Sequence, residues 1–365
     1  MVLKALMASS SLYQPSTHSL SASFIRSLQN KIFCCLNKRF KIFLNYFLGP
    51  VLFIWLGYSI YRQIQQQQNL QQSWEMMLIS IRGPQSWKLI LAFLLLGLNM
   101  WAEAFKWKVL VGSIQKVSVA KAIKATLSGN ALVFNSINRI GESAARSVYL
   151  DEGNRLKGMA IAMVGSMSLI LVTLIMGILG LLYMRAFILD ATHRLEGLSM
   201  FWLNGLISVL CFGTILLGMI YYKLSWLIRL IEKVPFVARY RFVVEHLENL
   251  HWWFLTKILL LSLLRYVVYI AQYVLVMQVF KVEADVSDTA ALVTVMMVVL
   301  LIIPSITLAD LGIRGEVSLH LFGLISSNML GIIAAVGSIW IINLIVPAIA
   351  GSIFLLSIRL FRNIK

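Results

Sequence analysis

The stretch from residue 317 to residue 358 reads VSLHLFGLISSNMLGIIAAVGSIWIINLIVPAIAGSIFLLSI and contains no Asp, Glu, Lys or Arg. As one α-helix its 42 residues would measure about 63 Å, roughly twice the hydrocarbon thickness of a bilayer. The stretch must therefore fold back on itself, and Ser326, Ser327 and Asn328 supply a polar turn. The sequence thus predicts a full membrane span over residues 331–357, preceded by a helix that ends before the turn.

The composition of the whole chain supports the same class of protein. The 365 residues are 59% hydrophobic and only 13% charged, with a mean hydropathy of +0.83. Soluble domains are usually about 45–50% apolar and about 25% charged. These values exclude a soluble globular protein, a disordered chain and a disulfide scaffold, and they predict an all-α polytopic membrane protein.

Apolar stretches along the chain predict about six full transmembrane helices, because a crossing takes about 20 residues. Besides residues 331–357, these stretches cover residues 42–61, 87–107, 158–184, 198–222 and 254–280. Two further stretches, residues 125–138 and 289–303, are too short, and Pro304 breaks the helix after the second. They predict two re-entrant or broken helical hairpins in inverted orientation, at about residues 122–150 and 289–328.

The distribution of basic residues predicts the orientation. With the N-terminus inside, 22 of the 32 Lys and Arg residues fall on cytoplasmic segments, 6 on external segments and 4 within membrane segments. This bias predicts a multi-pass protein of the bacterial inner (plasma) membrane with both termini cytoplasmic. We expect a basic cytoplasmic or interfacial arm over residues 1–40, a transmembrane domain over residues 41–365, and an amphipathic basic segment over residues 223–251. The net charge of +17 is assigned to loops that face anionic lipid rather than to nucleic-acid binding.

Each predicted hairpin carries ionisable residues. One cluster comprises Arg139, Glu142 and Arg146, and the other comprises Asp310, Arg314 and Glu316. In one interpretation these charges pair with each other and tie the hairpins together. In the other they line a polar cavity, where the arginines bind a lipid phosphate and the carboxylates hold an amine headgroup or a coupling proton. An ionisable group within a bilayer usually serves a function because burying it there is costly.

Other polar residues accompany these clusters. Asn138 adjoins Arg139, and Arg265 and Gln272 share one face of a predicted span, where they either bond a neighbouring helix or line the same cavity. Glu103 and Lys106 are interpreted as an ion pair at the membrane interface. The residues expected to break the hairpins are small, polar or proline: Asn135, Ser136, Gly141, Pro304, Ser305 and Gly312.

No metal site or cofactor is expected. The three cysteines and five histidines show no metal-ligand or redox spacing. Ser136 and Ser305 lie near the charged clusters, but no histidine accompanies them as a base, so an intramembrane enzyme is the least favoured hypothesis.

Two short motifs resemble the transmembrane domain of the lysylphosphatidylglycerol synthase/flippase family. They are residues 129–146, with the run NRIGE at 138–142, and residues 304–316, with LGIRGE at 311–316. The resemblance implies several spans plus re-entrant helices, and it places Arg139, Glu142, Arg146, Arg314 and Glu316 at motif positions. Well-understood members move aminoacylated phosphatidylglycerol from the inner to the outer leaflet. Ile137 stands where the family usually has proline, and the soluble synthase domain of bifunctional members is not expected here.

Together these patterns predict a stand-alone, flippase-like protein that translocates a phospholipid or related polar lipid. Its partners would be membrane lipids with an anionic or aminoacylated headgroup. The alternative is a non-transporting scaffold or partner of an envelope lipid or glycan synthase. A homo-oligomer or a synthase partner is left open.

Overall fold

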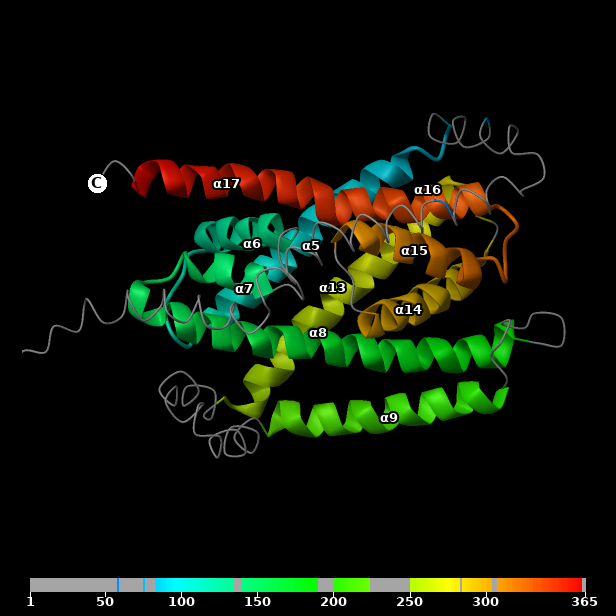
Figure 1. Ribbon diagram of the computed structural model, residues 1–365, viewed down its shortest axis with the longest axis horizontal. Helices are drawn as coiled ribbons and strands as arrows, with labels where there is room; N and C mark the ends of the chain where they lie inside the picture. Colours follow the sequence, from blue (N-terminus) through cyan, green and yellow to red (C-terminus); the bar gives the residue numbers. More distant parts are fainter. Residues whose placement is uncertain are drawn as a thin grey trace, which may run out of the picture. The chain divides into compact units, whose positions relative to one another are not determined.

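The computed structural model describes residues 58, 75, 83–133, 140–189, 200–223, 250–282, 284–303 and 307–362. These residues form helices joined by turns, with no strand among them (Figure 1). Five of the helical segments are long and apolar enough to cross a membrane, which confirms an all-α protein of the multi-pass class. They are Trp87–Val111, Glu152–Ile188, Met200–Tyr222, Trp252–Val279 and Met329–Phe354.

The helix bounds follow the apolar stretches of the sequence closely. The α-helices are α5 (Trp87–Val111), α6 (Val119–Val133), α7 (Ile140–Ser147), α8 (Arg155–Tyr183), α9 (Met200–Tyr222), α13 (Trp252–Val279), α14 (Val286–Ile302), α15 (Thr307–Phe322), α16 (Met329–Trp340) and α17 (Val346–Arg362). A 3₁₀ turn, η3 (Glu152–Asn154), precedes α8. Two π-helical turns, η4 (Met184–Ile188) and η5 (Ile341–Ile345), follow α8 and join α16 to α17. Asn328 caps α16 by accepting a bond from the Gly331 N–H, as the polar turn predicts.

Helices α5 and α13 pack against each other in antiparallel orientation. Lys88 Nζ donates to Gln278 Oε1 near one end of the pair, and Lys106 Nζ donates to Ser262 Oγ toward the other. Helix α6 begins a few residues after α5 ends, and α14 begins a few residues after α13 ends. Because α5 and α13 are antiparallel, α6 and α14 start at opposite ends of the helix pair.

Each short helix opens a hairpin that returns to the end where it started. After α6 and α7, helix α8 begins near the end of α5, because the Asp151 N–H and Asn154 Nδ2 both donate to Oε1 of Gln115, four residues after α5. After α14 and α15, the Asn328 side chain that caps α16 donates to the Phe280 carbonyl at the end of α13, at 3.0 Å. The two helical hairpins, α6–α7 and α14–α15, therefore start and end at opposite ends of the α5–α13 pair.

Each hairpin is packed against a long helix of the other half of the chain (Figure 1). Helix α14 lies along α8, where Gly177 and Gly180 admit Val298 and Thr294. Helix α6 lies along α17, where a Cβ on Gly351 would fall 1.8 Å from the Leu127 carbonyl oxygen. Such close approaches by small residues are typical of helix contacts in membranes.

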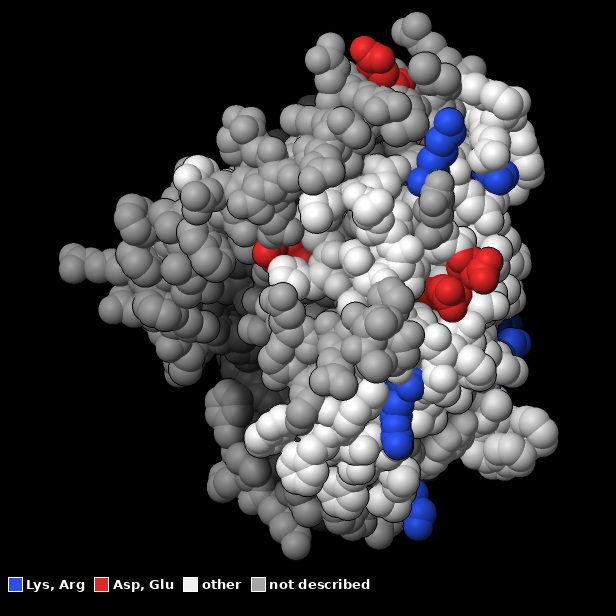
Figure 2. Space-filling model, turned by 90° about the vertical axis from the view of Figure 1, so that its right-hand side faces the viewer, with Lys and Arg blue, Asp and Glu red and all other residues white. Residues whose placement is uncertain are grey.

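Helix α9 lies alongside α8 (Figure 1), and many of its apolar side chains are exposed. Phe201 and Phe212 are among its most exposed side chains. The exposed apolar surface of α9 fits contact with lipid. Figure 2 shows the end of the described part of the chain that lies at the right in Figure 1, where acidic and basic side chains form small, separate groups among other residues.

Several predictions lie outside the described residues. These are the arm over residues 1–40, the span over residues 42–61 apart from Tyr58, and most of the amphipathic segment. Four of the residues expected to break the hairpins also lie outside them: Asn135, Ser136, Pro304 and Ser305. Gly141 is the second residue of α7, and Gly312 lies inside α15. A single glycine costs a helix only about 1 kcal/mol, which tertiary packing readily outweighs.

Candidate functional site: a buried polar layer

A polar layer separates two buried apolar clusters. One cluster contains Trp107, Ile161 and Ile258, and the other contains Leu292 and Ile339 with residues from the second halves of α8 and α13. Between them, the middle sections of α5, α8 and α13 contribute buried polar and charged side chains. Burial of a polar layer costs free energy unless its members bond to one another.

The layer lies at the midpoints of four apolar helices. Asn99 is the central residue of α5, because the bounds 87 and 111 average 99. The same average is 265.5 for α13, beside Arg265, and 169 for α8, beside Ser168. Asn343 lies in η5, close to the middle of the segment Met329–Phe354. Four largely apolar helical segments therefore bring polar groups to the same level.

Glu103 is the centre of the charged network. Its Oε1 accepts from Arg146 Nη1 at 2.6 Å, and its Oε2 accepts from Arg265 Nη1 and lies 3.0 Å from Lys106 Nζ. Arg146 also pairs with Glu142 on its own helix. The residues Glu103, Lys106 and Arg146 are 5%, 3% and 6% exposed, so the network is held away from solvent. We call these five residues, Glu103, Lys106, Glu142, Arg146 and Arg265, the Glu103 network.

Two asparagines extend the network to the C-terminal helix. Arg265 Nε donates to Asn99 Oδ1 at 2.7 Å, and Asn99 Nδ2 donates to Asn343 Oδ1 at 3.2 Å. Asn343 lies in the π-turn η5, and Pro347 follows it by four residues. Because proline has no N–H, the helix cannot continue its usual bond to the Asn343 carbonyl, and a π-turn accommodates the interruption.

A second chain of polar contacts leads from the network to α8. Lys106 Nζ donates to Ser262 Oγ at 3.4 Å, and Ser262 Oγ lies 2.7 Å from Ser168 Oγ. Ser168 donates in turn to the Gly165 carbonyl. Both serines are fully buried, so these bonds satisfy hydroxyl groups that would otherwise cost free energy.

Arg314 forms a separate cluster on α15 that reaches α13 one turn beyond Arg265. Its Nε donates to Asp310 Oδ2 at 2.7 Å, and its Nη1 donates to Tyr269 Oη at 3.4 Å. Tyr269 stacks edge-on against Tyr273, with the ring centroids 5.2 Å apart. Arg265 and Tyr269 are neighbours at i and i+4 on α13, so this helix contacts the charged groups of both hairpins.

Gly129 of α6 makes room for the ion pair of α7. A Cβ at this position would lie 3.0 Å from Arg146 Nε and 3.2 Å from Glu142 Cγ. Arg146 Nε is buried and has no hydrogen-bond partner within the described residues. The absence of a side chain at residue 129 therefore lets the Arg146–Glu142 pair lie directly on the α6 backbone.

The structure brings together some of the residues predicted from sequence and separates others. Arg146 and Arg265 meet at Glu103, and Glu142 joins them through Arg146. Asp310 and Arg314 pair with each other. Gln272 does not join either group: it donates to the Ala92 carbonyl of α5 at 2.8 Å. Glu316 lies on α15 and is half-buried, while Asn138 and Arg139 fall outside the described residues.

Glu103 and Lys106 form the ion pair that the sequence predicts, at 3.0 Å. The structure adds that both side chains are buried and bonded to other helices. Asn99, Asn343 and Tyr269 were not singled out at all. The sequence does hold a signal for Asn99 and Glu103: they are polar residues four apart in an apolar helix, so they share one face of it.

No group of three or more His, Cys, Asp or Glu side chains among the described residues is placed to hold a metal ion. No protein-family model matches the chain, and no curated protein matches it.

Proposed function

We propose that the protein translocates a phospholipid or related polar lipid between the two leaflets of a membrane. The observation that carries this proposal is the Glu103 network, which gathers five ionisable groups around Glu103, one helical turn from the central residue of α5. A headgroup that crosses a bilayer meets its highest barrier at the midplane, where charged groups lose their hydration. A polar layer at that level offers replacement partners.

The charge of the network favours an anionic group on the lipid. Lys106, Arg146 and Arg265 carry three positive charges, and Glu103 and Glu142 carry two negative charges, which leaves a formal balance of 3 − 2 = +1. A phosphate would compensate this charge, and arginine can bind it through two parallel N–H donors. The carboxylates would in turn bind an amine on the same headgroup.

The two hairpins supply a route to this layer from both sides. They start at opposite ends of the α5–α13 pair, and each contributes a charged cluster that contacts α13. We propose that they are re-entrant in the bilayer and act as alternating gates around the polar layer, as in transporters built from inverted repeats. The positive-inside bias supports an orientation with both termini in the cytoplasm of a bacterium.

A second candidate function is a membrane scaffold or synthase partner that moves no lipid. The observation in its favour is that the described charges already have partners: Glu103 binds three cations, and Asp310 binds Arg314. Buried pairs of this kind also specify one arrangement of helices without any ligand. The two functions therefore differ in whether lipid movement depends on these residues.

The deciding experiment reconstitutes the purified protein in liposomes that contain fluorescent phosphatidylglycerol. Transfer between leaflets is measured by the fraction of probe that a membrane-impermeant reductant quenches with time. The variants are Arg265→Ala and Arg314→Ala. The matched control is Arg155→Ala, whose side chain is 32% exposed and lies 3.6 Å from Glu152 at the start of α8.

We expect the wild type and Arg155→Ala to transfer lipid at the same rate. Arg265→Ala is expected to slow transfer by about 10-fold to 100-fold, because a hydrogen bond to a charged group contributes about 1.5–3 kcal/mol. Gel filtration of each variant confirms that it remains folded. If both buried variants transfer lipid as fast as Arg155→Ala, or if the wild type transfers none, the translocase is rejected in favour of the scaffold.

A further inference from the structure

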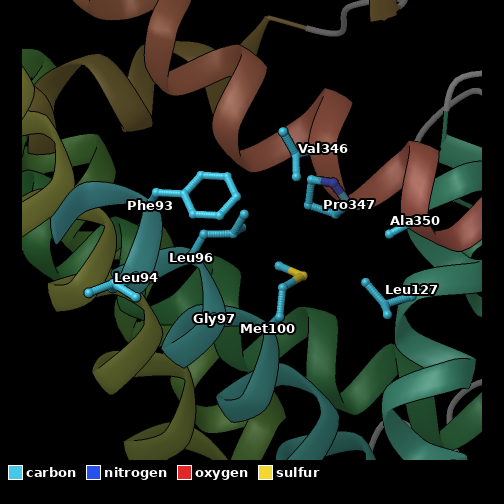
Figure 3. A pocket seen from close by; sticks show the side chains of 9 residues that line it. All are labelled: Phe93, Leu94, Leu96, Gly97, Met100, Leu127, Val346, Pro347 and Ala350. Atoms are coloured by element: carbon cyan, nitrogen blue, oxygen red, sulfur yellow. The ribbon is translucent and has the colours of Figure 1, made fainter. Parts of the chain in front are cut away.

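An apolar groove with a volume of about 300 Å³ lies between α5, α6 and α17 (Figure 3). All nine residues that line it are hydrophobic or glycine, and they include Phe93, Leu127 and Pro347. The volume is at the lower end of the range for small-molecule sites, about 300–1,000 Å³. Neither a charged headgroup nor a polar metabolite finds a partner on these walls, so the groove suits a hydrocarbon chain.

The groove adjoins the polar layer. Met100 lines the groove and follows Asn99 directly in the sequence. Val346 also lines the groove and lies one residue beyond η5, the turn in which Asn343 accepts a hydrogen bond from Asn99. Asn130 Nδ2 also contacts Met100 Sδ at 3.3 Å. Amide side chains therefore lie within one helical turn of the apolar walls. A molecule with a polar head and an apolar tail could contact both.

The far side of the groove is closed by tight packing of α17 on α6. At Gly351 the two helices are so close that a Cβ would lie 1.8 Å from the Leu127 carbonyl oxygen. On the α5 side Gly97 lines the groove, and a Cβ there would meet no atom within 4 Å. The groove therefore has free space beside α5 and none at the α6–α17 contact.

We infer that this groove holds an acyl chain of the anionic phospholipid that the protein translocates, while the phosphate binds at Asn99 and Arg265. The inference rests on the proposed function and adds to it a lateral entry between α5 and α17. The headgroup of an ordinary annular lipid stays at the membrane surface. A chain in this groove, in contrast, lies beside the polar layer at the middle of the helices, so the site selects lipids by headgroup as well as by chain.

The test uses phosphatidylglycerol with a photoreactive diazirine on one acyl chain, compared with a phosphatidylcholine carrying the same chain. Both are incorporated in liposomes with the full-length protein, and cross-linked peptides are mapped by mass spectrometry. The groove is blocked by Gly97→Trp. The matched control is Gly205→Trp on α9, because a Cβ at either glycine has open space around it and both variants should fold.

We expect phosphatidylglycerol to label residues 93–100 and 346–350 more than phosphatidylcholine does. Gly97→Trp should reduce this labelling about tenfold, equivalent to about 1.4 kcal/mol of binding, and should slow lipid transfer, whereas Gly205→Trp should do neither. Equal labelling by the two lipids would identify ordinary annular lipid and overturn the inference. Labelling that survives Gly97→Trp would overturn it as well.

The test also separates this inference from the proposed function. If Gly97→Trp transfers lipid normally while Arg265→Ala does not, the groove has no part in transfer and only the inference fails. If the wild type transfers no lipid at all, the proposed function fails. If phosphatidylglycerol still labels the groove selectively in that case, the groove is a binding site for an anionic lipid. The inference that lipid enters there for transfer is then rejected.

Discussion

Replacement of Glu103 by glutamine tests whether this carboxylate holds the polar layer together. Glu103 binds Lys106, Arg146 and Arg265, which come from three helices. Glutamine has nearly the same shape but no charge, and its NH₂ group would face cationic donors. The formal charge of the Glu103 network would rise from +1 to +2 at a buried site.

The expected cost is large. Removal of one partner from a buried ion pair typically destabilises a protein by about 3–5 kcal/mol, because the remaining charge stays buried without compensation. Total stabilities are about 5–15 kcal/mol, so Glu103→Gln should lose a substantial part of the free energy of unfolding. The measurement is denaturant unfolding in detergent micelles, followed by tryptophan fluorescence. Trp107 is fully buried one turn from Glu103, so its fluorescence should change when this region unfolds.

The matched control is Glu152→Gln, which removes a carboxylate whose side chain is 82% exposed and 3.6 Å from Arg155. Surface substitutions of this kind usually change stability by less than about 0.5 kcal/mol. The double variant Glu103→Gln with Arg265→Gln restores the charge balance and should be less unstable than the sum of the two single variants, by about 0.5–3 kcal/mol. If Glu103→Gln unfolds like Glu152→Gln, the central role of Glu103 is refuted.

Two further predictions concern glycines at close approaches. Gly129→Ala should lower the free energy of unfolding by about 1–3 kcal/mol, because its Cβ would lie 3.0 Å from Arg146 Nε, whereas Gly97→Ala, with open space, should be neutral or slightly stabilising in the same unfolding assay. Gly351→Ala should cost about 3 kcal/mol or more, because its Cβ would lie 1.8 Å from the backbone oxygen of Leu127 and α17 would have to move away from α6. A thermal midpoint for Gly351→Ala equal to that of Gly97→Ala would contradict this packing.

Much of the architecture is encoded locally. The apolar stretches predict the described spans to within a few residues, since hydrophobic length decides whether a helix crosses a bilayer. The pairs Glu142–Arg146 and Asp310–Arg314 also follow from sequence, because residues four apart face each other on any helix. The turn before α16 is equally local, because its Asn328 cap bonds a backbone three residues away.

The site itself depends on contacts that no local pattern specifies. Arg265 reaches Glu103 across 162 positions of the chain, and Asn99 reaches Asn343 across 244. Which turns of two antiparallel helices meet is set by how their small and large side chains interlock, so a shift of one turn would have left Glu103 buried beside apolar groups. The apolar length of α5 identified a membrane helix, but only the packed register of α5 against α13 made its glutamate the centre of a network.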